Sequence, residues 1–89
     1  METKHYSFAV VIEPDEDRWR AYCPLLETLG GAAWGHSHDE AMRNIQEVVQ
    51  MVVESLVEHG EPVPAAPFYD RLSTVTVSVE APTHSLHGD

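Results

Sequence analysis

The chain has 89 residues, 43% of them hydrophobic, which is the composition of one small folded domain rather than of a disordered chain. Fifteen acidic against five basic side chains give a formal net charge of −10, which argues against direct binding to DNA or to an anionic membrane. The single cysteine excludes an internal disulfide, and neither a signal-peptide pattern nor a membrane-length apolar run occurs, so we expect a cytoplasmic protein. Because the core is small, we also expect a homo-oligomer, either a dimer or a tetramer.

The first predicted element is a strand at residues 6–12, which is rich in β-branched and aromatic side chains. Its alternation places Phe8, Val10 and Ile12 on one side, which we assign to the core. The polar sequence at residues 14–17 then predicts a hairpin connection.

A second strand is predicted at residues 19–23, where Trp19, Ala21 and Cys23 share the core side. Pro24 ends this strand, because proline cannot donate a backbone hydrogen bond to a sheet.

Residues 24–31 predict an irregular loop that ends in Gly30 and Gly31. A short third strand follows at residues 32–36, although alanine and glycine are poor strand formers.

A long helix from Ser37 to Gly60 is the most completely specified element of the chain. Ser37 is a good N-cap, and Glu40 completes a Ser-x-x-Glu capping box. Gly60 suits the left-handed position after a helix, and Pro62 prevents continuation. The apolar side chains recur at helical spacing and form one stripe: Ala41, Met42, Ile45, Val48, Val49, Val52, Val53 and Leu56.

After the helix, three prolines in residues 61–67 predict an extended connector, which Phe68 and Tyr69 would anchor. Residues 72–79 alternate as a final strand with its valines facing inward. The element order is therefore β-β-β-α-β, an α+β fold in which an antiparallel meander is covered on one face by the helix. We expect a single domain over residues 1–80 and a polar tail at residues 81–89.

Six histidines suggest a metal site, but their spacing does not support one. His36 and His38 are two residues apart, with Asp39 and Cys23 as further candidate ligands, and no paired Cys-x-x-Cys or His-x-x-x-His spacing occurs. His84 and His87 lie in the polar tail. We therefore predict no metal and no cofactor.

Catalysis finds equally little support. Cys23 with His36 or His38 is the one Cys/His combination, but this thiol lies on the predicted core side. Glu13 and Glu40 are the carboxylates that a metal-dependent hydrolase would use, although no acidic partner is predicted beside them on the last strand. We predict that the protein is not an enzyme and keep a residual nuclease or hydrolase as an alternative.

The remaining features suit contacts with another protein. Met51 and Val57 lie outside the apolar stripe, on opposite flanks of the helix, and Asp15, Glu16 and Asp17 form an acidic turn. These five residues are our candidate partner or oligomer contacts, and the net charge favours a basic protein partner.

The chain also resembles the HicB family, the antitoxin component of a type II toxin–antitoxin pair, from Tyr6 to about Pro64. The resemblance lies in the order and spacing of several short motifs. These are Tyr6 with Val10-Val11-Ile12-Glu13, the acidic turn, Trp19 through Cys23-Pro24, Gly35-x-Ser37-x-x-Glu40-Ala41 with Asn44-Ile45, and Gly60-Glu61 with Pro64.

This resemblance implies a partial RNase H-like fold without the nuclease carboxylates, and a role in binding and occluding a small basic mRNA-cleaving toxin of the HicA type. The chain departs from the family in the loop at residues 24–30, so contacts made there by relatives are not carried over. Many relatives continue into a DNA-binding domain, whereas this sequence stops soon after its last strand, so we expect no direct DNA binding. Two alternatives stay open: an orphan member without a cognate toxin, or an oligomeric scaffold for another protein.

Overall fold

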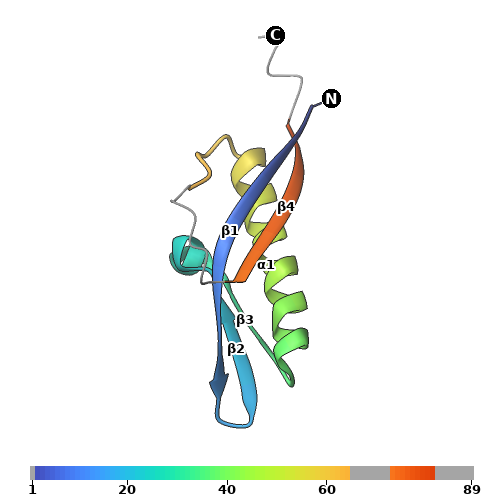
Figure 1. The fold of residues 1–89 in the computed structure, drawn as a ribbon. Helices are drawn as coiled ribbons and strands as arrows, with labels where there is room; N and C mark the ends of the chain where they lie inside the picture. The colour runs from blue at the N-terminus through green and yellow to red at the C-terminus, as the bar shows by residue number, and fades with distance from the viewer. Residues whose placement is uncertain (1, 65–72, 82–89) are drawn as a thin grey trace, which may run out of the picture.

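The computed structural model describes residues 2–64 and 73–81, which form a two-layer α+β structure with one helix on one face of a four-stranded antiparallel sheet (Figure 1). The strand order in the sheet is β3-β2-β1-β4. The predicted β-β-β-α-β order is confirmed. The elements are β1 (Glu2–Asp15), β2 (Arg18–Tyr22), the 3-10 helix η1 (Pro24–Leu29), β3 (Ala32–Gly35), α1 (His38–Glu58) and β4 (Ser73–Ala81).

Strand β1 is twice as long as the predicted strand at residues 6–12 because its two halves have different neighbours. Its C-terminal part pairs with β2, from Val11 opposite Tyr22 to Asp15 opposite Arg18. Its N-terminal part pairs with β4 over residues 2–10. The polar residues at the two ends of β1 therefore form backbone hydrogen bonds with neighbouring strands. The side-chain pattern of β1 alone does not predict these bonds.

The core lies between α1 and the sheet, as the alternation predicted. Ile12 and Trp19, both expected on this side, are only partly buried at its margin. The helix contributes an i, i+4 stripe, and the helix residues flanking that stripe are partly buried. The buried side chains are Phe8, Val10, Ala21, Cys23, Leu26, Ala33, Ala41, Ile45, Val49, Val53, Val75, Val77 and Val79.

The N-terminus of α1 confirms the predicted cap with one change of partner. The Glu40 N–H donates to Ser37 Oγ at 3.0 Å, as a capping box requires. The Glu40 carboxylate, however, accepts from the backbone N–H of His36 rather than from that of Ser37. The returning hydrogen bond therefore fixes the end of β3 as well as the start of the helix.

The C-terminus of α1 ends at the predicted glycine. Gly60 has a φ of +70°, and its N–H donates to the carbonyl of Val57, while the N–H of Glu61 donates to the carbonyl of Leu56. This pair of bonds is a Schellman motif, which satisfies two of the carbonyls that a helix end leaves free.

The segment predicted as an irregular loop contains η1. Pro24 occupies its first turn, Leu26 is fully buried, and Gly30 ends it with a φ of +88°. The 3-10 helix forms because burying Leu26 against the core requires the chain to turn sharply between β2 and β3.

The outer edge of β4 is covered by the helix. The side-chain amides of Gln46 and Gln50 donate to the carbonyls of Thr76 and Ser78, both at 2.8 Å. These two bonds occupy carbonyls that would otherwise be free to pair with a strand from another molecule.

Strand β4 includes Glu80 and Ala81, which lie beyond the end of the final strand predicted at residues 72–79. The predicted anchor Phe68–Tyr69 and the tail histidines His84 and His87 lie outside the described residues. The division into a domain at 1–80 and a tail at 81–89 stays a prediction.

Candidate protein-interaction surface

The acidic turn lies at the tip of the β1–β2 hairpin, where Asp15 is already engaged within the chain. The indole N–H of Trp34 donates to Asp15 Oδ2 at 3.0 Å, and Arg18 Nε lies 3.8 Å from the same oxygen. Glu16 and Asp17 are exposed, and Glu16 has a φ of +59°. Two of the three predicted acidic contacts are therefore free for a partner.

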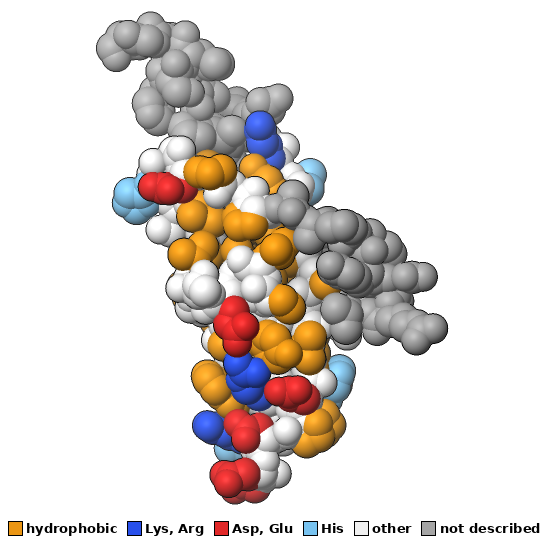
Figure 2. Space-filling model, turned by 90° about the vertical axis from the view of Figure 1, so that its left-hand side faces the viewer, with side chains coloured by type: hydrophobic (Ala, Val, Ile, Leu, Met, Phe, Trp, Pro, Cys, Tyr) orange, Lys and Arg blue, Asp and Glu red, His pale blue; other side chains and the backbone are white. Residues whose placement is uncertain are grey.

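A second charged cluster lies on the sheet face opposite α1. Arg20 donates to Glu27 Oε2 at 3.0 Å and to Glu13 Oε2 at 3.4 Å, and its guanidinium lies 4.2 Å from the centre of the Tyr22 ring. Desolvation acts to lower the pKa of Arg20, but the hydrogen bonds and charges of Glu27 and Glu13 outweigh it and raise that pKa. Figure 2 shows charged side chains gathered toward the lower end of the molecule, the hairpin end of Figure 1, below a more hydrophobic middle.

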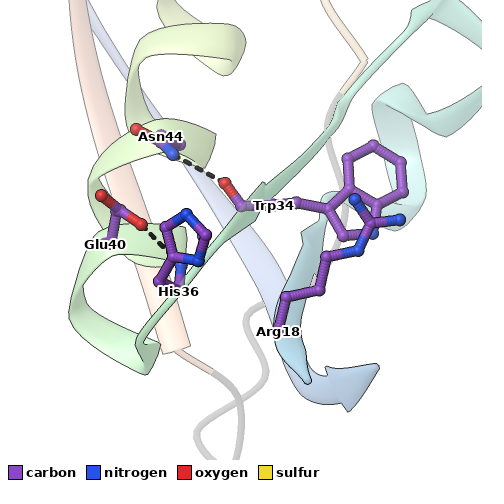
Figure 3. A pocket seen from close by; sticks show the side chains of 6 residues that line it. Arg18, Trp34, His36, Glu40 and Asn44 are labelled. Carbon is purple, nitrogen blue, oxygen red and sulfur yellow. Dashed lines mark hydrogen bonds between the residues drawn. The ribbon is translucent and has the colours of Figure 1, made fainter. Parts of the chain in front are cut away.

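A hollow of about 320 Å³ lies between β3 and the N-terminal half of α1 (Figure 3). The Trp34 ring stands at one side with the Arg18 guanidinium 5.0 Å from its centre. On the helix side, Asn44 Nδ2 donates to the Trp34 carbonyl at 2.7 Å, and Glu40 caps His36. Two hydrogen bonds therefore join the end of β3 to α1 on the helix side of the hollow, while the Trp34 ring points away from α1, on the same side of the sheet as Arg20 (Figure 3).

A second hollow, of about 270 Å³, lies between η1 and the C-terminal half of α1. It is lined by Leu29, Met51, Val52, Ser55 and Leu56. Met51 is 61% exposed and Leu29 is 49% exposed, so an apolar surface is open here.

The two helix residues predicted as contacts differ in exposure. Met51 is exposed, whereas Val57 is half-buried and packs against the core. Sequence reasoning missed Leu29 and Trp34. The alternation of β3 was a usable signal for Trp34, because Ala33 and Gly35 face the core on either side of it.

The cysteine and histidine considered for catalysis or metal binding pack against other residues of the fold. Cys23 is fully buried, and burial raises the pKa of its thiol, with backbone N–H groups at Leu26 and Leu25 opposing that effect. His38 contacts the edge of the Trp19 ring, with 5.5 Å between ring centres. Within residues 2–64 and 73–81, no three His, Cys, Asp or Glu side chains are placed to hold a metal ion.

Helix α1 is amphipathic, and none of the helices described is long and apolar enough to cross a membrane.

Comparison with known proteins identifies the relatives of this chain. No family model matches it. A UPF0150 protein of Synechocystis sp. is 35% identical over 60 residues, which are 66% of this chain and 73% of that protein. The crystal structure of the N-terminal domain of the antitoxin HicB from Burkholderia pseudomallei has a TM-score of 0.61 at 23% identity, covering 84% of this chain and 99% of that domain.

The structure of the B. pseudomallei antitoxin HicB itself also has a TM-score of 0.61, at 21% identity, covering 93% of this chain and 80% of that one. At these identities the two structures show the fold, while the curated relative shows the family. The resemblance seen in the sequence motifs is therefore confirmed. The chain belongs to the HicB-like UPF0150 family and has the fold of the HicB N-terminal domain.

Proposed function

We propose that this protein is a non-enzymatic antitoxin module that binds and occludes a small basic mRNA-cleaving toxin of the HicA type. The observation that carries the proposal is the HicB-like fold, which extends over nearly all of the HicB N-terminal domain. The net charge of −10 supports a basic partner, because opposite charge accelerates encounter and favours the correct orientation.

The state of the candidate catalytic carboxylates supports a binding role. Glu13 lies within hydrogen-bonding distance of Arg20, and Glu40 caps the junction of β3 and α1. A carboxylate held by a cation or by a backbone N–H is a weaker ligand for a catalytic metal than a free one. Assays of RNA and DNA hydrolysis with Mg²⁺ and Mn²⁺ should show no activity, and activity that is lost in Glu13→Gln would contradict this part of the proposal.

The oligomeric state is proposed to be a dimer or a tetramer, because an 89-residue chain buries a small core and gains stability from association. Light scattering across a range of concentrations measures the mass directly. A monomer at all concentrations would contradict this proposal without affecting toxin binding.

The test of the antitoxin role is co-expression with any small basic reading frame found beside the gene. We expect the wild-type chain to restore growth and to co-purify with the toxin. Val49→Asp is the matched control, since a charge in the centre of the buried helix stripe should unfold the domain and abolish rescue. Absence of both rescue and co-purification with the wild-type chain would refute the proposal for that pair.

A further inference from the structure

One flank of α1 is open along most of its length. Glu40 and Asn44 line the hollow next to β3, and Met51 and Ser55 line the hollow next to η1. The four positions are spaced i, i+4, i+11 and i+15, which places them on one stripe of the helix about 22 Å long. We call the surface formed by this stripe with Leu29 the helix-flank surface.

Two of the four exposed large hydrophobic side chains among the described residues lie on the helix-flank surface. They are Leu29 and Met51, with exposed fractions of 49% and 61%. Methionine is enriched in protein interfaces, where its adaptable side chain fills a partner's pockets.

Carboxylates border this apolar surface along the helix. Glu47 is four residues before Met51, Glu54 is three residues after it, and Glu58 is seven residues after it. At these spacings the three side chains are neighbours of Met51 on the helix surface, and all three are exposed. Arg43, four residues before Glu47, is an exposed cation near the other end of the stripe, and Arg18 already contacts Asp15 and the Trp34 ring. The surface is therefore apolar at its centre and acidic along one border.

Two other surfaces are already satisfied by contacts within the chain. The opposite flank of α1 is bound to β4 through Gln46 and Gln50. The sheet face opposite the helix carries the Arg20 cluster and, on β4, the hydroxyl side chains of Thr74 and Thr76. Among the described surfaces, the helix-flank surface combines exposed apolar side chains with exposed carboxylates, of which Glu54 accepts a hydrogen bond from Gln50 at 2.9 Å.

We infer that the helix-flank surface is where this chain holds its basic protein partner, which inserts an apolar side chain between Leu29 and Met51 and sets lysine or arginine against Glu47, Glu54 and Glu58. This inference rests on the proposed function, and it adds the surface and the chemistry of the contact. A second copy of this chain is a poorer occupant, because it would place carboxylates against carboxylates.

The first experiment places a charge in the apolar centre. Met51→Glu and Leu29→Glu should each weaken binding to an RNase-inactive form of the adjacent toxin by about tenfold or more and abolish growth rescue. Thr74→Glu is the matched control, since it adds the same charge at an exposed position on the other face and should change the dissociation constant by less than about threefold. Thermal unfolding of each variant verifies that the fold is intact.

The second experiment separates local contact from net charge. The double variant Glu47→Lys with Glu58→Lys should weaken binding far more than Asp39→Lys with Glu80→Lys, although both change the net charge equally and all four positions are exposed. Equal effects of the two pairs would overturn the inference in favour of long-range attraction alone.

The outcomes distinguish the inference from the proposed function. If the wild-type chain does not bind the toxin, both the proposed antitoxin role and the proposed binding surface are refuted. If the wild-type chain binds and Met51→Glu binds equally well, the inference alone fails. If Met51→Glu instead converts an oligomer into a monomer without weakening toxin binding, a second copy occupies the surface and the inference is overturned.

Discussion

At Gly35 the last residue of β3 passes directly over the first turn of α1. A Cβ atom built on Gly35 would lie 2.5 Å from the backbone nitrogen of Ala41 and 2.8 Å from the carbonyl carbon of Glu40. Backbone atoms cannot rotate away as a flexible side chain can, so only glycine allows this approach. In the motif Gly35-x-Ser37-x-x-Glu40-Ala41, the glycine is therefore required for steric reasons, while Ser37 and Glu40 cap the helix.

We predict that Gly35→Ala lowers the free energy of unfolding by about 1 to 3 kcal/mol, because strand and helix must separate to admit the methyl group. Chemical denaturation measures the loss. Gly60 provides the contrast, since nothing lies within 4 Å of its Cβ position and its φ is +70°. Asparagine tolerates that left-handed conformation, so Gly60→Asn should retain most of the stability while Gly35→Asn should not. Equal losses at both sites would show that space is not the cause at Gly35.

Cys23 provides a second prediction at the scale of one residue. Burial raises the pKa of its thiol above the ordinary value of 9.0 in the folded chain. The unfolded chain therefore loses this proton first as the pH rises, so the contribution to stability is complete below about pH 9 and decreases above it. Urea unfolding between pH 7 and 10 should show this decrease in the wild-type chain relative to Cys23→Ala, which lacks the thiol. A constant difference between the two would contradict the prediction.

At the scale of the element, the two ends of α1 and the outer edge of β4 are stabilised by hydrogen bonds of different origin. The caps are local: Ser37 and Gly60 act on residues within four positions along the chain. The edge contacts are distant, since Gln46 and Gln50 bond to carbonyls about thirty residues away in sequence. The caps could therefore be predicted from the sequence, whereas the bonds of Gln46 and Gln50 to β4 could not.

We predict that Gln46→Ala with Gln50→Ala destabilises the protein by about 1 to 3 kcal/mol, since two carbonyls lose their partners. Alanine is the better helix former, so weakening of the helix cannot explain a loss. Hydrogen exchange should become faster in β4, and self-association should increase because the strand edge is uncovered. Arg43→Ala is the control, as an exposed helix residue without a bond to β4, and a loss as large there would contradict the prediction.

The helix η1 is the element that the sequence did not reveal. The strong turn formers Pro24, Gly30 and Gly31 predict a loop over these residues. A 3-10 helix of six residues has little intrinsic stability, and here it depends on the burial of Leu26. Leu29 is exposed beside Met51 only because η1 is set against the helix, so this part of the candidate surface could not be predicted from local pattern.

At the scale of the whole molecule, charge is the dominant property. The net charge of −10 acts beyond any single contact, and salt screens it over about 10 Å at 0.1 M ionic strength. We predict that the association rate constant for the basic toxin falls about tenfold or more between 50 and 500 mM NaCl, while the dissociation rate constant changes less. Stopped-flow fluorescence measures both. An association rate that does not depend on salt would show that the acidic surface does not guide the encounter.

The sequence by itself determined the fold class, the extent of α1, the inward faces of the strands and the acidic character. Each of these depends on local periodicity, capping chemistry or composition, which act between residues close in the chain. The family motifs followed from the same stretches, and Gly35, Ser37 and Glu40 carry both the local structure and the resemblance.

Only the tertiary structure decided which side chains remain available to a partner. It showed that Asp15 is bound to Trp34 and that Val57 packs against the core. It also brought Leu29 alongside the flank of α1 that carries Met51. The physical reason is that exposure depends on contacts between elements distant in sequence, and a residue's own pattern states which face it occupies but not what covers that face.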